Sequence, residues 1–294
     1  MPILIIGGII AVLIFGLSAL WRWRREARQR RERAAPFPPE WIAVLERNFT
    51  LYSHLPDKLR AQLHGLINIF MAEKTFEGCA GLEVTDEMKV TIAAQACVLL
   101  LNRATEVYPG LHTILVYPHP YVAESPRLFA GQVIHEPSAR AGESWTRGEV
   151  VLAWDHVEHG ARTMNDGHNV VMHEFAHQLD QEDGHADGAP RLGKGQSYRA
   201  WARVLGADYE LLRKEVRNHV EDVMDAYGAT NPAEFFAVAT ETFFERPRQL
   251  QRKHAALYDA LRSYYGVDPG AWLKRQETGD RRQETGGREV ISNQ

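Results

Sequence analysis

NVVMHEFAHQLD, residues 169–180, is the stretch of sequence from which the fold and the chemistry of this chain can be worked out. Within it, His173, Glu174 and His177 form the pattern H-E-x-x-H. On a helix, positions i and i+4 share a face, so both imidazoles can meet one metal ion. Glu174 lies beside them and can polarise a metal-bound water. The helix gains a packed side from its apolar residues, which are Val170, Val171, Phe175, Ala176 and Leu179.

A catalytic zinc ion usually has three protein ligands and one open position for water. The segment DAYGATNPAEFFAVATE, residues 225–241, predicts a helix that Asn231 caps and Pro232 enters. Glu234 and Glu241 fall on one face of that helix, two turns apart, and Glu234 suits the positive end of the helix dipole. Both glutamates can instead be solvated carboxylates. Asp180, one turn beyond His177, is equally a partner for a ligand imidazole or an ordinary polar residue.

The bare H-E-x-x-H pattern is weak because three fixed residues recur by chance. The two histidines could also be a surface pair or buried histidines with other partners. A predicted strand upstream and a candidate third ligand downstream favour a metal site over both of these alternatives.

The remainder of the chain predicts an α+β domain, mostly helical, with a small central β-sheet. Apolar spacing indicates helices early in the chain and again from 168 to 265, and β-rich segments lie between them. We expect a domain at residues 41–270 and a disordered polar tail at 271–294, in which RQETG occurs twice. The early helices are expected at 41–49, 56–73 and 86–102, and the strands at 112–117, 132–135 and 149–154.

Composition limits the function classes. The 294 residues are 45% hydrophobic and 24% charged, as in a globular protein, and two cysteines exclude a disulfide framework. Residues 1–40 hold seven arginines and three glutamates, a net charge of +4. The whole chain carries −4, so the other 254 residues sum to −8. This acidic body offers no footprint for nucleic acid.

The N-terminus predicts a membrane anchor. Residues 3–20 contain eighteen residues without a charge, which is close to the length that a helix needs to span a bilayer. Trp21, Trp23 and the seven arginines follow this run. We therefore expect a transmembrane anchor at residues 1–21, a basic, Pro-rich linker at 22–40, and a single-pass protein of the inner membrane whose body faces the cytoplasm. A cleaved signal peptide fits less well, since no basic residue precedes the run.

Beyond these local patterns, HEFAHQLD followed by DAYGATNPAEFFAVATE closely resembles the Mlc titration factor A family of zinc metallopeptidases. More distantly, the chain looks like the catalytic domain of anthrax lethal factor. The resemblance extends over most of residues 40–270 and includes VYPHPYV at 116–122 and GESWTRGEVVLAWDHV at 142–157. It implies a zincin-like domain with one zinc ion per chain.

The resemblance also implies roles for single residues. His173, His177 and Glu234 would bind zinc, as in a gluzincin, and Glu174 would be the general base. Tyr227 would stabilise the oxyanion, and His135 would reach the metal in a resting state. From its place on the same helix as Glu234, and not from the resemblance, Glu241 is expected to support a ligand or to pack beside the site.

The activity implied by the resemblance is peptide hydrolysis of the aminopeptidase type, with the transcriptional repressor Mlc as a partner. If the chain is anchored, a freely diffusing role is less well supported, and so is Mlc as a partner. One alternative is a non-catalytic zinc domain that sequesters a regulator at the membrane, although a purely structural site has no need of Glu174. An intramembrane protease is excluded because the motif lies between polar flanks.

Overall fold

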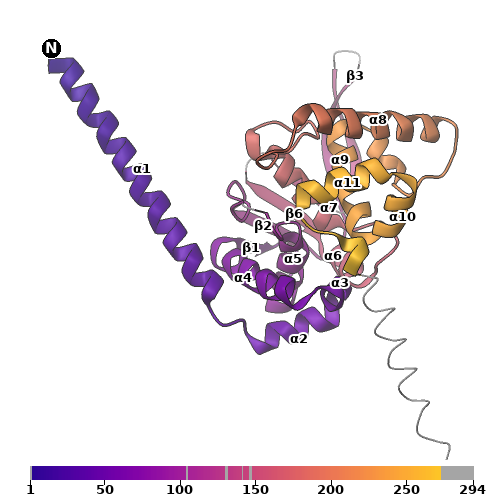
Figure 1. The fold of residues 1–294 in the computed structure, drawn as a ribbon, viewed down its shortest axis with the longest axis horizontal. Helices are drawn as coiled ribbons and strands as arrows, with labels where there is room; N and C mark the ends of the chain where they lie inside the picture. The colour runs from indigo at the N-terminus through magenta and orange to yellow at the C-terminus, as the bar shows by residue number, and fades with distance from the viewer. Residues whose placement is uncertain (1, 104, 130–131, 141, 146–147, 273–294) are drawn as a thin grey trace, which may run out of the picture.

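The structure is a computed structural model that describes residues 2–272 except 104, 130, 131, 141, 146 and 147. Side chains are described in 15–103, 105–120 and 148–272. The body is mostly helical around a small sheet (Figure 1).

The central sheet has four strands in the order β1-β2-β6-β5. The strands β1 (Thr75–Gly78), β2 (Thr113–Tyr117) and β6 (Glu149–Ala153) are parallel, and β5 (Gly142–Trp145) runs antiparallel to β6 at one edge. In β2 the buried residues alternate, with Ile114 and Val116 inside, whereas β6 is buried along almost its whole length. Both are inner strands of the sheet, and β6 is the one that is covered on both faces.

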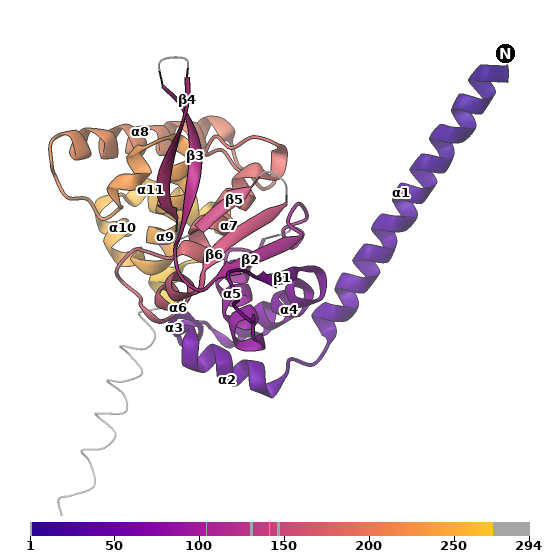
Figure 2. The same cartoon turned by 180° about the vertical axis from the view of Figure 1, so that it is seen from behind.

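A second sheet consists of the antiparallel hairpin β3 (Tyr121–Phe129) and β4 (Gln132–Arg140). Figures 1 and 2 both show this hairpin projecting from the body beyond the helix α8.

Helices α2 (Pro39–Asn48), α3 (Thr50–His54), α4 (Asp57–Glu73), α5 (Asp86–Val98) and α6 (Trp154–Arg162) precede or flank the sheet. The C-terminal part is helical, as expected from residue 168 on. It contains α7 (Val170–Asp180), α8 (Tyr198–Arg217), α9 (Pro232–Glu245), α10 (Pro247–Lys253) and α11 (Ala255–Tyr265), with the short 3-10 turns η1 (Gln181–Asp183) and η2 (Ala226–Ala229).

One hydrophobic core joins these helices to the sheet. Phe175 of α7 shows how the parts meet: its ring centroid lies 4.7 Å from that of Tyr108 and 5.7 Å from that of Phe70 on α4. This buried aromatic cluster fixes the orientation of α7, because a packed aromatic side chain leaves its helix little freedom to rotate.

The N-terminal prediction is wrong. Residues 3–20 belong to α1 (Pro2–Ala34), but no helix in the part of the chain that the structure describes is both long and apolar enough to cross a membrane. This finding overturns the transmembrane anchor at residues 1–21. It also overturns the localisation in the inner membrane and the membrane as a partner of residues 3–20.

The arginines that follow the apolar run show why the prediction failed. We expected them to form a linker facing lipid headgroups, but they continue the same helix as far as Ala34. Arg25 forms ion pairs with Glu73 and Glu106, and Arg28 donates a hydrogen bond to the backbone oxygen of Ala72. This part of α1 therefore packs on α4, while its N-terminal part projects away from the body (Figures 1 and 2).

Candidate metal centre

Helix α7 begins at Val170, within the segment from residue 168 on that was expected to be helical. The side chain of Asn169 caps it by accepting a hydrogen bond from the backbone N–H of Met172 at 2.9 Å. Val171, Phe175 and Leu179 lie in the core. The helical period then places His173 and His177 together on another side of α7, where both are only partly buried.

Helix α9 meets this side of α7. Asn231 caps α9 by accepting the backbone N–H of Glu234 at 3.0 Å, and Pro232 occupies the first turn. The loop after α7 touches the same place at Gly188, which has φ of 76°. A Cβ there would come within 2.4 Å of the backbone oxygen of Pro232, so only glycine allows the loop this close to the start of α9.

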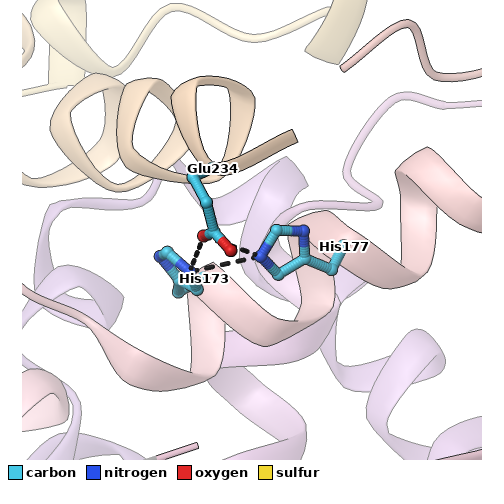
Figure 3. Close-up of side chains that lie close together, drawn as sticks. All are labelled: His173, His177 and Glu234. Atoms are coloured by element: carbon cyan, nitrogen blue, oxygen red, sulfur yellow. Dashed lines mark hydrogen bonds and ion pairs between the residues drawn. The ribbon is translucent and has the colours of Figure 1, made fainter. Parts of the chain in front are cut away.

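Three side chains converge between the two helices (Figure 3). The Oε2 atom of Glu234 lies 3.0 Å from Nε2 of His173 and 3.2 Å from Nε2 of His177. The two Nε2 atoms are 3.2 Å apart. Among the described residues, His173, His177 and Glu234 are the group whose ligand atoms could hold a metal ion, since they all lie within 4.8 Å of one another.

The other ring nitrogen of His173 contacts a second carboxylate. Its Nδ1 lies 2.7 Å from Oε1 of Glu241, and the second oxygen of Glu241 accepts the backbone N–H of Asn169 at 2.6 Å. A carboxylate on Nδ1 keeps the proton there and leaves the lone pair of Nε2 facing Glu234. Glu241 thus orients the His173 ring.

The cluster fits a divalent metal ion. Two imidazole nitrogens and one carboxylate oxygen are a usual protein ligand set for zinc. Burial would raise the pKa of Glu234, but hydrogen bonds with His173 and His177 hold it well below its ordinary value, so the ligand is anionic. Without a cation, three acceptor atoms would face one another at about 3 Å, which is unfavourable unless a proton lies between them.

Glu174 follows His173 directly on α7 and is 6% exposed. Burial raises the pKa of Glu174 to about 7, although the neighbouring histidines act in the opposite direction. A carboxyl group with a pKa near neutrality can both accept and return a proton. Among the predicted site residues, Glu174 therefore has the acid–base properties that a general base needs.

Tyr227 lies on η2, directly before α9. Its side chain is 53% exposed, and its ring centroid is 5.9 Å from that of His173. The carboxylate of Asp225 caps η2 by accepting the backbone N–H of Tyr227 at 2.7 Å. The structure thus brings Tyr227 to the solvent-facing side of the cluster.

The structure describes the side chain of only one of the two other predicted residues, Asp180. The Oδ2 atom of Asp180 accepts the backbone N–H of Gly188 at 2.9 Å, and its buried Oδ1 has no hydrogen-bond partner among the described residues. Asp180 thus braces the loop at Gly188. His135 lies on β4 opposite Pro126, and its side chain is outside the described side chains.

Sequence reasoning missed two residues behind the site. The Nδ2 atom of Asn169 donates to the backbone oxygen of Gly160 at 2.9 Å and to Oε1 of Glu245 at 3.3 Å. Glu245 is 3% exposed, and burial raises its pKa to about 8. A helical spacing signal was available, because Glu245 follows Glu241 by four residues on α9.

Known proteins are similar in sequence to this chain over most of its length. Residues 21–266 match the family model described as glucose-regulated metallo-peptidase M90. An uncharacterized protein of Synechocystis sp. is 42% identical over 264 residues, covering 89% of this chain and 94% of that protein. The Mlc titration factor A proteins of Yersinia pestis and Yersinia pseudotuberculosis are each 31% identical over 261 residues, covering 87% of this chain and 93% of theirs.

Proposed function

Since this chain belongs to the M90 family of glucose-regulated metallo-peptidases, we propose that it hydrolyses peptide bonds with one zinc ion held by His173, His177 and Glu234. The observation that carries the proposal is the convergence of these three ligand atoms within 4.8 Å, with Glu174 one residue from His173. The family supports a metal-dependent peptidase. The choice of zinc rests on the two imidazoles and the carboxylate.

Each residue has a task in this reaction. The zinc ion would lower the pKa of a water molecule and polarise the scissile carbonyl. Glu174 accepts the proton that the water loses as its oxygen attacks the carbonyl carbon. The hydroxyl of Tyr227 donates a hydrogen bond to the negative oxygen that develops. Glu174 then passes the proton to the leaving amine as the C–N bond breaks, so the proton is returned.

Glu241 would be a positioning residue in this scheme. Its carboxylate keeps the Nδ1 proton on His173 and aims the Nε2 lone pair at the metal position. By resemblance we expect cleavage at the amino end of peptides.

The first test separates the metal from the chemistry. Glu174→Gln should keep about one zinc ion per purified chain and lose peptide hydrolysis by at least about a hundredfold. Zinc is measured by elemental analysis and hydrolysis by mass spectrometry of a peptide mixture. Glu210→Gln is a matched control, because Glu210 is an exposed glutamate on α8.

Two results would contradict the proposal. The purified chain without metal could cleave peptides as fast as the zinc-loaded chain. Alternatively, Glu174→Gln could retain full activity, in which case any zinc would serve structure alone.

The name of the Yersinia relatives favours a second role. We propose that the chain also binds a transcriptional repressor related to Mlc. Binding without cleavage would then persist in Glu174→Gln, since that variant keeps the fold. Size-exclusion chromatography of Glu174→Gln with a purified Mlc repressor tests this role, and two separate peaks at concentrations of tens of micromolar would reject it.

A further inference from the structure

A pocket of about 580 Å³ lies close to the candidate metal centre. It is lined by the end of α8, the chain that leads from α8 to η2, the segment just before α7, and Arg246. His168 and Ala226 line it, and each is followed within one residue by a part of the site: Asn169, which caps α7, and Tyr227. The pocket therefore lies beside two segments that lead directly into the proposed active site.

The pocket has apolar walls. Leu212 and Met224 are buried beneath it, whereas Val216 and Val220 are 36% and 51% exposed. Exposed valines beside a concave surface are a feature of binding sites, because an apolar group of a ligand can cover them. An aliphatic side chain is the matching ligand group.

The rim of the pocket is acidic. Glu221 and Asp225 are exposed there, and Asp225 lies 3.9 Å from His168 across the opening. The guanidinium group of Arg246, also in the lining, is turned to the chain, since it donates to the backbone oxygen of Val223 at 3.0 Å. The Arg246 side chain is therefore held against the chain, and the exposed carboxylates of Glu221 and Asp225 make the rim attractive to cations.

The wall of the pocket is held in place. Asp222 accepts hydrogen bonds from His254 at 3.0 Å and forms an ion pair with Lys253 at 2.6 Å. Both Asp222 and His254 have almost fully buried side chains. A chain segment fixed by a buried ion-pair cluster forms a pocket that exists before the ligand arrives.

We propose that this pocket binds part of the peptide substrate, and that it selects a segment carrying an aliphatic side chain flanked by lysine or arginine. The inference rests on the proposed peptide hydrolysis. It adds a substrate class: basic, amphipathic peptides. The acidic body, with its net charge of −8 outside residues 1–40, draws the same peptides to the site.

The test uses the full chain loaded with zinc and two synthetic decapeptides. One contains leucine between lysines, and the other contains leucine between glutamates at the same positions. We expect kcat/KM to be about fivefold to tenfold higher for the lysine peptide, as two exposed ion pairs would give. The preference should shrink as the salt concentration rises.

Two variants locate this preference. Glu221→Lys should remove most of the advantage of the lysine peptide, and Val220→Asp should raise KM for both peptides by weakening the apolar contact. The matched controls are Glu210→Lys and Leu211→Asp, which change exposed residues of α8 outside the pocket lining. The controls should keep the wild-type preference and KM.

The outcomes separate the two proposals. If zinc-loaded wild-type protein cleaves both decapeptides equally, or if Glu221→Lys and Val220→Asp behave like their controls, the pocket proposal is overturned while peptide hydrolysis stands. If zinc-loaded protein cleaves neither these peptides nor the peptide mixture, the proposed hydrolysis fails, and the pocket proposal fails with it.

Discussion

His173 and His254 are surrounded in nearly the same way, yet they serve different ends. Each ring has a carboxylate at both nitrogens: Glu241 and Glu234 at 2.7 and 3.0 Å for His173, and Asp208 and Asp222 at 2.7 and 3.0 Å for His254. The third group differs. His177 lies 3.2 Å from His173, whereas the ammonium group of Lys253 lies 2.6 Å from Asp222.

The third group decides what each cluster can hold. At His254 the lysine supplies positive charge, so charged side chains of the protein itself balance the buried carboxylates. At His173 the third group is a second imidazole with a lone pair, which leaves a place where a metal ion can balance the carboxylates. Two carboxylates around a histidine therefore do not by themselves indicate a metal site. The next group beside them decides whether the cluster can hold a metal ion.

The largest expected effect separates the two histidines by metal content. His173→Ala should lose bound zinc and lower peptide hydrolysis by more than about a hundredfold, because one of three ligands is gone. His254→Gln should keep about one zinc ion per chain. Elemental analysis after gel filtration measures both. Equal zinc content in both variants would contradict the proposed difference between the two histidine clusters.

The second prediction sharpens the roles of the carboxylates around His173. Glu234→Ala should weaken zinc affinity most, since it removes a ligand atom. Glu241→Ala should weaken it less, by about tenfold to a hundredfold, since it frees the His173 ring. Competition with a chromophoric chelator gives both affinities, and Asp208→Asn is the control beside His254. The reverse order would reassign the ligand.

The third prediction concerns stability against pH. Burial would lower the pKa of His254, but hydrogen bonds to Asp208 and Asp222 raise it to about 9. This is above the unfolded value of about 6.5. The stabilisation is therefore complete below pH 6.5 and is lost as pH rises through about 9, with a size of about 3 kcal/mol. Urea unfolding at pH 6, 8 and 10 measures it.

In His254→Gln this loss between pH 6.5 and 9 should disappear, and the variant should be less stable than wild type at pH 6. A variant with the same pH profile as wild type would show that another group titrates. The zinc content of each sample serves as a check, so that loss of metal is not mistaken for the effect of His254.

The last prediction concerns Glu245, where burial raises the pKa of the carboxyl group to about 8. A carboxyl group whose folded pKa lies above its unfolded value costs stability as pH rises from about 4.5 to 8. Glu245→Gln removes the ionising group and can still accept from Asn169. It should raise the free energy of unfolding by up to about 5 kcal/mol at pH 8.5 and change it little at pH 5. A destabilised variant at pH 8.5 would contradict this account.

The parts of the site that could be predicted from sequence are those encoded by spacing within one helix. His173 and His177 are four residues apart on one helix, and Asn231 marks the start of α9. Both the histidine pair and the start of α9 could therefore be identified without a structure. The His254 cluster could not be predicted, because Asp208, Asp222 and His254 come from segments with no fixed spacing.

The errors in the fold have the same origin. Strands β1 and β5 have four residues each, too few for an alternating pattern to stand out. The anchor prediction relied on local hydropathy and charge, whereas the contacts of Arg25 with Glu73 and Glu106 depend on how α1 and α4 meet.

The spacing of residues along helix α9 sets the relative positions of three side chains in the site. Glu234, Glu241 and Glu245 are separated by seven and four residues, and in a helix these spacings return to within about 20° and about 40° of the same direction. One line of side chains thus carries a candidate metal ligand, the partner of His173 Nδ1 and the partner of Asn169. A single residue deleted between Glu234 and Glu241 would turn one end by about 100° against the other. The residues in between can change in identity, but their number is fixed.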